Sequence, residues 1–216
     1  MKTISSNYEY SYCSSNSGHH HAYLLPPLLQ LLGQVTLPSQ QRPRVLDLGC
    51  GNGSLSHFLA QQGYEVVGVE ESESGIKQAR HNFSNCQFIQ ASIYDLPYND
   101  LKNSFDYVIS CEVIEHLLYP RELVRAAKRC LKFHGRLIMS TPYHSYLKNL
   151  IIALSGKMDG HFTTLWDGGH IKFFSVETMT TLLKTEEMNN IEFKFAGRMP
   201  YLWKSMLCSS SISEEK

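Results

Sequence analysis

Residues 45–53, VLDLGCGNG, join a short apolar run to three glycines at alternate positions. The run is typical of a buried strand, and a helix-like segment follows it. In a parallel, doubly wound sheet, ligands bind outside the carboxyl ends of the strands. Gly49, Gly51 and Gly53 would bring bare backbone to that place and allow unusual dihedral angles. We therefore interpret this stretch as a ligand-binding loop, and the plain alternative is a tight turn.

Two carboxylates limit which ligand the loop could hold. The glycine spacing is G-x-G-x-G, whereas the dinucleotide fingerprint is G-x-G-x-x-G. Asp47 lies two residues before the first glycine and would repel a pyrophosphate. It suits a ligand with a cationic end, such as S-adenosylmethionine. Glu70 ends the next strand, VVGVE, close to the interval expected for a ribose-binding acid.

Around this loop, apolar runs alternate with helical stretches, which indicates an α/β fold with a parallel sheet covered on both faces. The final two strand-like segments are joined only by GRMPY, which is too short for a crossover helix, so we expect an antiparallel hairpin. The expected strands are 44–49, 64–70, 86–92, 104–111, 136–142, 191–198 and 202–210. The expected helices are 22–33, interrupted or started near Pro26–Pro27, and 54–63, 74–83, 120–135 and 175–186.

The chain has 216 residues, a length that suits a single domain over residues 1–216. Its formal net charge is +0. This charge balance gives no reason to expect nucleic acid as a partner. Residues 1–22 are polar, lack the apolar core of a signal peptide and predict a mobile arm. No apolar run approaches the length of a transmembrane helix. The six cysteines form no C-x-x-C pair, so we expect reduced thiols and a cytoplasmic protein.

A polar cluster follows the fourth strand. In CEVIEHLLYP, Glu112, Glu115 and His116 have the spacing i, i+3 and i+4, which would place them on one face of a helical turn. Such a group can hold a divalent metal or orient the histidine as a base. The alternative is a solvated helix start. A glycine-bearing, aromatic segment further along the chain adds His161 and His170.

The order VLDLGCGNG, VVGVE, SFDYVIS, EVIEHL and GRLIMSTP resembles class I S-adenosylmethionine-dependent methyltransferases over residues 45–142. The stretches HHHAYLLPPLL, GGHIKFFSVETM and GRMPYLWKSM resemble the bacterial ubiquinone-biosynthesis O-methyltransferase group. This resemblance implies a seven-stranded sheet of order 3-2-1-4-5-7-6 with strand 7 antiparallel. The cofactor-binding residues that it implies are Asp47, Gly49, Cys50, Gly51, Gly53, Glu70, Ser92, Ile93 and Cys111.

Ser92 and Cys111 need separate comment among these positions. Relatives often carry Gly-Asp-Ala after the third strand, where this chain has Ala91-Ser92-Ile93, so Ser92 would be a neutral partner for the adenine. Cys111 would lie beside the methionine part of the cofactor. The same motifs are similar to metal-dependent small-RNA 2′-O-methyltransferases. That similarity makes Glu112, Glu115, His116 and His170 candidate catalytic residues and candidate metal ligands.

Together these features predict a methyltransferase that acts on oxygen of a small aromatic or quinone-precursor acceptor. His116 is favoured narrowly as a general base over a metal site. Residues 143–174 would form an acceptor-side insertion, and the arm, with Tyr8, Tyr12 and His21, would cover the cofactor. The alternatives are an RNA ribose 2′-O-methyltransferase, an NAD-dependent oxidoreductase or a non-catalytic cofactor-binding module. Candidate aromatic residues of the acceptor pocket are Phe162, Trp166, Phe173, Phe174, Tyr143 and Tyr146.

Overall fold

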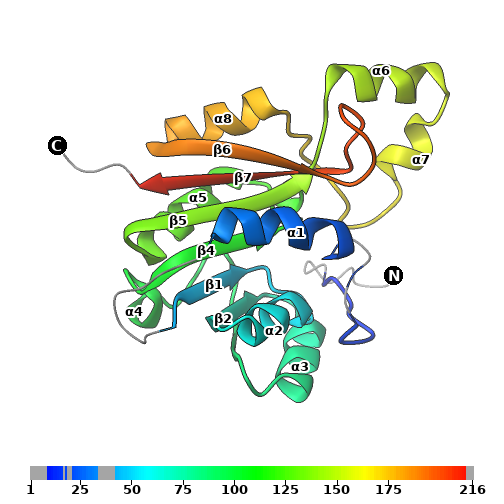
Figure 1. Cartoon of the computed structure of the whole chain (residues 1–216). Coiled ribbons are helices and arrows are strands. Elements are labelled where there is room, and N and C mark those ends of the chain that lie inside the picture. Colours follow the sequence, from blue (N-terminus) through cyan, green and yellow to red (C-terminus); the bar gives the residue numbers. More distant parts are fainter. Residues whose placement is uncertain (1–8, 17, 19–20, 34–41, 213–216) are drawn as a thin grey trace.

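A seven-stranded sheet forms the centre of the computed structural model, which describes residues 9–16, 18, 21–33 and 42–212 (Figure 1). The strand order is β3-β2-β1-β4-β5-β7-β6. β1 to β5 pair in parallel, and β7 pairs antiparallel with both β5 and β6. The predicted fold class and the predicted C-terminal hairpin are therefore confirmed. The strands are β1 (Arg44–Leu48), β2 (Glu65–Glu70), β3 (Gln87–Gln90), β4 (Phe105–Cys111), β5 (Leu131–Pro142), β6 (Met188–Ala196) and β7 (Ser205–Ile212).

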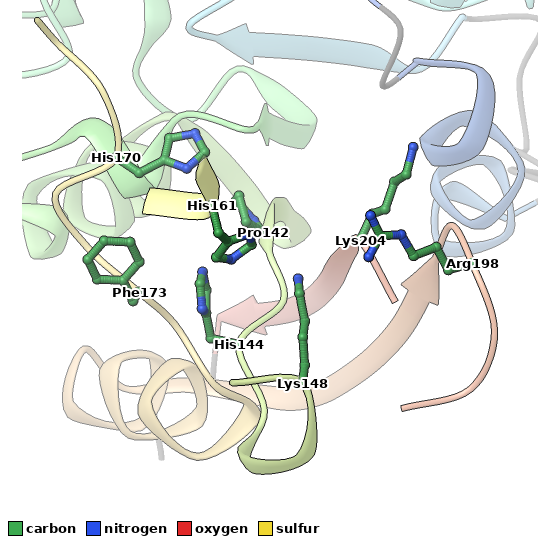
Figure 2. A pocket seen from close by; sticks show the side chains of 8 residues that line it. All are labelled: Pro142, His144, Lys148, His161, His170, Phe173, Arg198 and Lys204. Carbon is green, nitrogen blue, oxygen red and sulfur yellow. The ribbon is translucent and has the colours of Figure 1, made fainter. Parts of the chain in front are cut away.

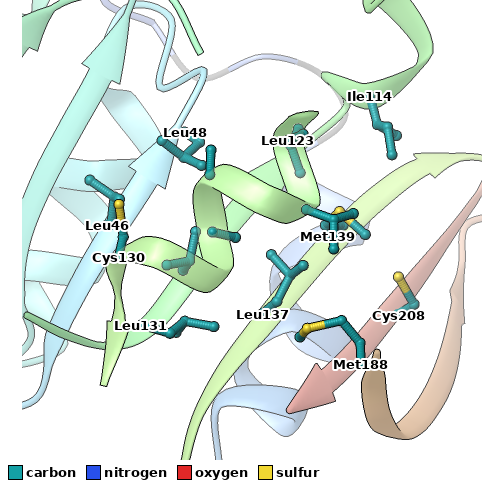
Figure 3. Close-up of a cluster of buried hydrophobic side chains, with 14 of the residues drawn as sticks. Leu46, Leu48, Ile114, Leu123, Cys130, Leu131, Leu137, Met139, Met188 and Cys208 are labelled. Carbon is teal, nitrogen blue, oxygen red and sulfur yellow. The ribbon is translucent and has the colours of Figure 1, made fainter. Parts of the chain in front are cut away.

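Helices cover both faces of this sheet. One face packs against α1 (His21–Leu32), α2 (Ser54–Gln61) and α3 (Glu73–Asn82). The other packs against α4 (Tyr98–Leu101), α5 (Pro120–Cys130) and α8 (Val176–Thr185). Because side chains alternate along a strand, Val45 points into the first core and Leu46 into the second. Figure 3 shows the second core, where leucine and methionine side chains of the sheet meet α5.

The structure corrects the expected boundaries of two helices. The helix that begins at Pro120 ends at Cys130 rather than at Gly135, because Leu131 already pairs with Phe105 as the start of β5. The extra residues form an irregularity in the register, where His134 has a φ of 64°. α1 begins at His21 and runs through Pro26 and Pro27 without a break. Four leucines of α1 are buried against the sheet, and this burial stabilises a helix that lacks two backbone donors: Leu24, Leu28, Leu31 and Leu32.

The start of α8 is as the sequence predicts. The Ser175 hydroxyl accepts from the backbone N–H of Thr178 at 3.2 Å, and the Thr178 hydroxyl accepts from the N–H of Ser175 at 2.9 Å. This reciprocal pair satisfies two backbone donors that a helix N-terminus would otherwise leave open. This capping pair fixes the start of α8, where the segment that carries His170 ends.

Residues 143–174 lie between β5 and α8 and include α6 (Tyr146–Leu154) and α7 (Met158–Phe162), which extend beyond the end of the sheet (Figure 1). They follow the carboxyl end of β5, which pairs with β4, so they stand at the edge of the sheet where the parallel strands end. All six cysteines are free thiols. Among the described residues, no helix combines the length and apolar character needed to cross a membrane.

Candidate active site

The glycine loop between β1 and α2 adopts a backbone that side chains disfavour. Gly49, Gly51 and Gly53 have φ values of 78°, 55° and 79°, in the left-handed region. The N–H groups of Gly49 and Cys50 both donate to the carbonyl of Val69, at 2.8 and 3.0 Å. These bonds tie the loop to the end of β2 and bring its bare backbone to the edge where the parallel strands end.

Asp47 lies beneath this loop and is shielded from solvent. Its side chain is 1% exposed, and the hydroxyl of Ser56 donates to it at 2.6 Å. Burial raises the pKa of Asp47 to about 7, the hydrogen bond from Ser56 opposes this rise, and the charge of Glu70 adds to it. The sequence predicted this carboxylate at the loop, and the structure adds that its charge is held in a low-dielectric place.

Glu70 connects the loop to the start of α3. One carboxylate oxygen accepts from the N–H of Gly51 and the other from the N–H of Ser72, both at 2.9 Å. Burial raises the pKa of Glu70, while these two hydrogen bonds lower it. Each carboxylate oxygen has a second lone pair, so the group can still accept from a ligand hydroxyl.

The N-terminal segment 9–16 lies directly against this part of the chain. The Ser72 hydroxyl donates to the carbonyl of Tyr10 at 2.8 Å, and the N–H of Tyr12 donates to the Ser74 hydroxyl at 3.0 Å. The ring of Tyr12 packs over Gly51, where a Cβ atom would collide with it. Tyr8 lies outside the described residues.

Sequence reasoning missed three residues that hold this segment: Asn52, Ser72 and Ser74. The amide of Asn52 donates to the carbonyls of Ser14 and Asn16, at 2.8 and 2.9 Å. Asn and Ser next to glycines are usual in turns. For that reason the pattern carried no signal for an intramolecular clasp.

The remaining cofactor candidates lie around the same edge. Ser92 and Ile93 follow β3 and are half-buried, and Ile93 packs on the core. Cys111 ends β4, and burial raises the pKa of its thiol, as it does for Cys50. At neutral pH both thiols are therefore protonated, which suits packing rather than nucleophilic chemistry.

A second group of polar side chains stands at the carboxyl end of β4. A short 3₁₀ turn, η1 (Ile114–His116), follows the strand. The N–H groups of Ile171 and Lys172 donate to the carbonyl of Glu115 at 2.9 and 3.0 Å, which draws the distant His170 to this turn. One side-chain ligand atom from each of Glu115, His116 and His170 then lies within 4.8 Å of the other two.

The side chains of this trio are held in unequal ways. Glu115 is fully buried, and neither carboxylate oxygen has a hydrogen-bond partner among the described residues. Burial, and then the charge of Glu112, raise its pKa well above the usual value. The Nδ1–H of His116 donates to the carbonyl of Gly168 at 2.8 Å, so Nε2 is the nitrogen left without this partner. Burial lowers the pKa of His170 to about 4.

Glu112 stands apart from the trio, although its spacing predicted a shared face. Its φ is 55°, so it does not belong to the helical turn. Its carboxylate accepts from the Ser140 hydroxyl at 2.8 Å, and the same hydroxyl accepts from its N–H at 3.1 Å. Burial raises the pKa of Glu112 to about 7. Glu112 thus contacts β5 and influences Glu115 through its charge.

Aromatic residues of the insertion divide into two groups. The ring centroid of Trp166 lies 5.8 Å from that of His116, 5.7 Å from that of His170 and 6.2 Å from that of Tyr10. Phe162 and Phe173 pack edge to face at 5.0 Å, and both rings lie against that of His144. Of the other candidates, Tyr143 and Phe174 belong to the core, and Tyr146 is 85% exposed.

Comparison with known proteins places this architecture. Residues 40–194 match the family described as "Methyltransferase domain". The chain belongs to this family. It is 29% identical over 182 residues to the ubiquinone biosynthesis O-methyltransferase of Ruegeria sp. (strain TM1040), which covers 79% of this chain and 70% of that protein. It is 36% identical to the corresponding protein of Idiomarina loihiensis, over 45% of this chain and 42% of that one.

Solved structures share the fold of this methyltransferase at lower identity. The PH0226 protein of Pyrococcus horikoshii OT3 aligns with a TM-score of 0.68 and 23% identity, over 92% of this chain and 93% of that one. The magnesium protoporphyrin IX methyltransferase of Synechocystis PCC 6803, solved with bound SAH, aligns at 0.65 and 20% identity, over 88% and 82%. The protein is therefore an S-adenosylmethionine-dependent methyltransferase. The alternative of an NAD-dependent oxidoreductase is not supported.

Proposed function

We propose that this methyltransferase transfers the methyl group to an oxygen of a small aromatic acceptor of the quinone-precursor type. One observation carries the proposal, namely the buried Glu115 carboxylate with two unpartnered oxygens beside His116 and His170. The similarity of the chain to ubiquinone biosynthesis O-methyltransferases supports the same acceptor class.

Oxygen acceptors need such a group because they must lose a proton. Methyl transfer from a sulfonium is an in-line displacement with a good leaving group, so positioning and desolvation supply much of the rate. A phenol has a pKa of about 10 and is largely protonated at neutral pH. A site that removes this proton as the bond forms raises the fraction of reactive acceptor.

The trio supplies the necessary parts. The contact with Gly168 holds the His116 ring and leaves Nε2 free to accept a proton. The ring of His170 lies 4.9 Å from that of His116 and is uncharged at neutral pH because its pKa is low. The Glu115 carboxyl group lies next to both rings, and its raised pKa means that it is ionised only when a positive charge, such as an imidazolium, stands beside it.

The same donor set fits a divalent cation. A carboxylate and two imidazoles are usual ligands for transition metals, and the orphaned oxygens of Glu115 are buried without a compensating donor. A cation held by Glu115, His116 and His170 would lower the pKa of the acceptor hydroxyl. The orphaned carboxylate favours this version over the sequence expectation of a metal-free base.

Chelation and single substitutions test the proposal. Methyl transfer from labelled S-adenosylmethionine to catechols is measured before and after treatment with a chelator. We expect activity to be lost and then restored by Mg²⁺, Mn²⁺ or Zn²⁺. His116→Ala and His170→Ala should each lower kcat by about 10²–10⁴. His81→Ala, an exposed histidine on α3, is the matched control.

A second measurement does not depend on activity. The cation that restores turnover should raise the melting temperature of the parent and fail to raise that of Glu115→Gln. Activity that survives chelation, with a loss only in His116→Ala, would assign the proton to a metal-free base. Near-parent turnover of His116→Ala on an accepted catechol would contradict both versions. Methyl transfer to a small RNA, measured in the same assay, tests the alternative of an RNA ribose 2′-O-methyltransferase.

A further inference from the structure

A cavity of about 190 Å³ opens next to the trio (Figure 2). His170 lies at its boundary, so the cavity is continuous with the proposed proton-accepting group. In Figure 2, His170 and Phe173 stand on the opposite side of the view from Arg198 and Lys204. The lining comes from the end of β5, from the insertion and from the connection between β6 and β7: Pro142, His144, Lys148, His161, His170, Phe173, Arg198 and Lys204.

The charge of this lining is one-sided. Lys148, Arg198 and Lys204 are cationic, and no acidic side chain of the described chain lines the cavity. None of the three forms an ion pair with a carboxylate of a described residue. Their partners are neutral, since Lys148 donates to the carbonyl of Tyr143 at 2.7 Å and Lys204 lies 5.0 Å from the ring centroid of Tyr23.

Crowding of these cations lowers the pKa values of groups in the cavity. Lys148 is buried, and this burial lowers its pKa to about 8, with a further lowering by the charge of Arg198. The charge of Glu112, which lies outside the lining, partly opposes the effect. The charges of Lys148 and Arg198 also lower the pKa of His161 after burial. An anion in the cavity would relieve this repulsion.

We propose that the cavity binds the anionic group, a carboxylate or a phosphate, of the methyl acceptor. The inference rests on the proposed O-methylation and names the acceptor more closely. Arg198 and Lys204 would hold the anion through charge-assisted hydrogen bonds, and Lys148 would add its field. The ring would lie against Phe173, and the hydroxyl to be methylated would reach the His170 side.

The size of the cavity supports a one-ring acceptor. A cavity of about 150 Å³ accommodates benzene in an engineered protein, so about 190 Å³ suits a single ring with small substituents. Phe173 is 46% exposed and offers an aromatic surface for such a ring. A nucleic-acid strand would instead need a longer cationic groove.

Matched acceptors and matched substitutions test the proposal. Binding of catechol, 3,4-dihydroxybenzoate and 3,4-dihydroxybenzyl phosphate is measured by calorimetry with S-adenosylhomocysteine present, and methylation of each by label transfer. We expect at least one anionic ring to bind ten times more tightly than catechol. The two anionic probes separate the carboxylate source from the phosphate source.

Arg198→Gln and Lys204→Gln should each raise Kd and KM for the anionic ring about tenfold and change those for catechol little. Both side chains are exposed, so the variants should fold, and Lys157→Gln, an exposed lysine of the insertion that does not line the cavity, is the control. Affinity for the cofactor should not change in any of them.

The outcomes separate the two proposals. Anionic rings that bind through Arg198 and Lys204 but are not methylated on oxygen would retain the anion site and overturn O-methylation. Catechol methylated as well as its anionic counterparts, with both variants at parent KM, would retain O-methylation and overturn the anion site. Equal binding of the three rings would also overturn the anion site. Methylation of a short RNA alone would replace the aromatic acceptor with a nucleic-acid acceptor.

Discussion

Removal of the N-terminal segment should weaken cofactor binding, because Tyr12 covers the glycine loop. The ring of Tyr12 packs on Gly51 and Gly75, and the segment is clasped by Ser72, Ser74 and Asn52. We expect Tyr12→Ala to remove the aromatic cover of the glycine loop and to leave the clasp in place.

The size of this effect follows from the burial of the ring. Full burial of a large apolar side chain contributes about 1.5–3 kcal/mol, and Tyr12 is half-buried. A contribution of about 1–2 kcal/mol corresponds to a rise in Kd of about 5- to 30-fold. Deletion of residues 1–16 also removes the clasp and should raise Kd at least as far.

Calorimetry with S-adenosylmethionine and S-adenosylhomocysteine measures the change. Cys13→Ser, at an exposed position in the same segment, is the control, and thermal melts show whether the truncated protein keeps its fold. Unchanged affinity would mean that the segment plays no part in binding. Tighter binding in Tyr12→Ala would refute the reasoning more strongly, since the ring would then compete with the cofactor for its place.

Two further substitutions test the carboxylates of the loop. Glu70→Gln leaves one of the N–H groups of Gly51 and Ser72 without an acceptor, so denaturant melts should show a loss of about 1–3 kcal/mol in unfolding free energy, with weaker cofactor binding; full stability would contradict this. The folded pKa of Asp47 is raised from 3.8 to about 7, so its contribution to stability is present below about pH 4 and lost as pH rises through 7. Without cofactor, Asp47→Asn should remove up to about 4 kcal/mol of this decline, and parallel pH curves for the two proteins would contradict the shift.

Local patterns in the sequence predicted the sheet, and they also placed the glycine loop and Glu70 at the carboxyl ends of neighbouring strands. The strand and glycine spacing of residues 45–53 fixes a turn whose positive φ values only glycine adopts freely, and Glu70 follows at the end of the next strand. These features are close together in the chain. Their geometry therefore follows from local stereochemistry and the handedness of the parallel crossover.

Features that depend on distant contacts were less predictable. The spacing of Glu112, Glu115 and His116 indicated one helical face, but Glu112 turns away to Ser140, a residue of β5. His170 joins the trio because the backbone that follows it bonds to the carbonyl of Glu115. No spacing rule encodes such a bond. The same holds for the end of α5, where pairing of Leu131 with β4 overrides a helical pattern.

The cations of the cavity illustrate the same limit in another way. Lys148 and Arg198 come from segments 50 residues apart in a chain of zero net charge, so composition conceals their meeting. The charge balance of the whole chain gives only the sum of its charges and leaves a local concentration of charge undetected. A site for one anionic group requires only such a local concentration.

Trp166 connects the N-terminal segment at the glycine loop with the trio of Glu115, His116 and His170. Its ring contacts Tyr10 of the segment that clasps the cofactor loop, and it contacts both histidines of the trio. We expect that an N-terminal segment ordered over a bound cofactor would, through this ring, also support the segment that carries His170. Aromatic pairs of this kind contribute about 0.5–1.5 kcal/mol, which sets an upper limit of about 2- to 13-fold on the coupling through this contact. Because such coupling is reciprocal, an acceptor that orders Trp166 against the trio should tighten the cofactor by the same factor.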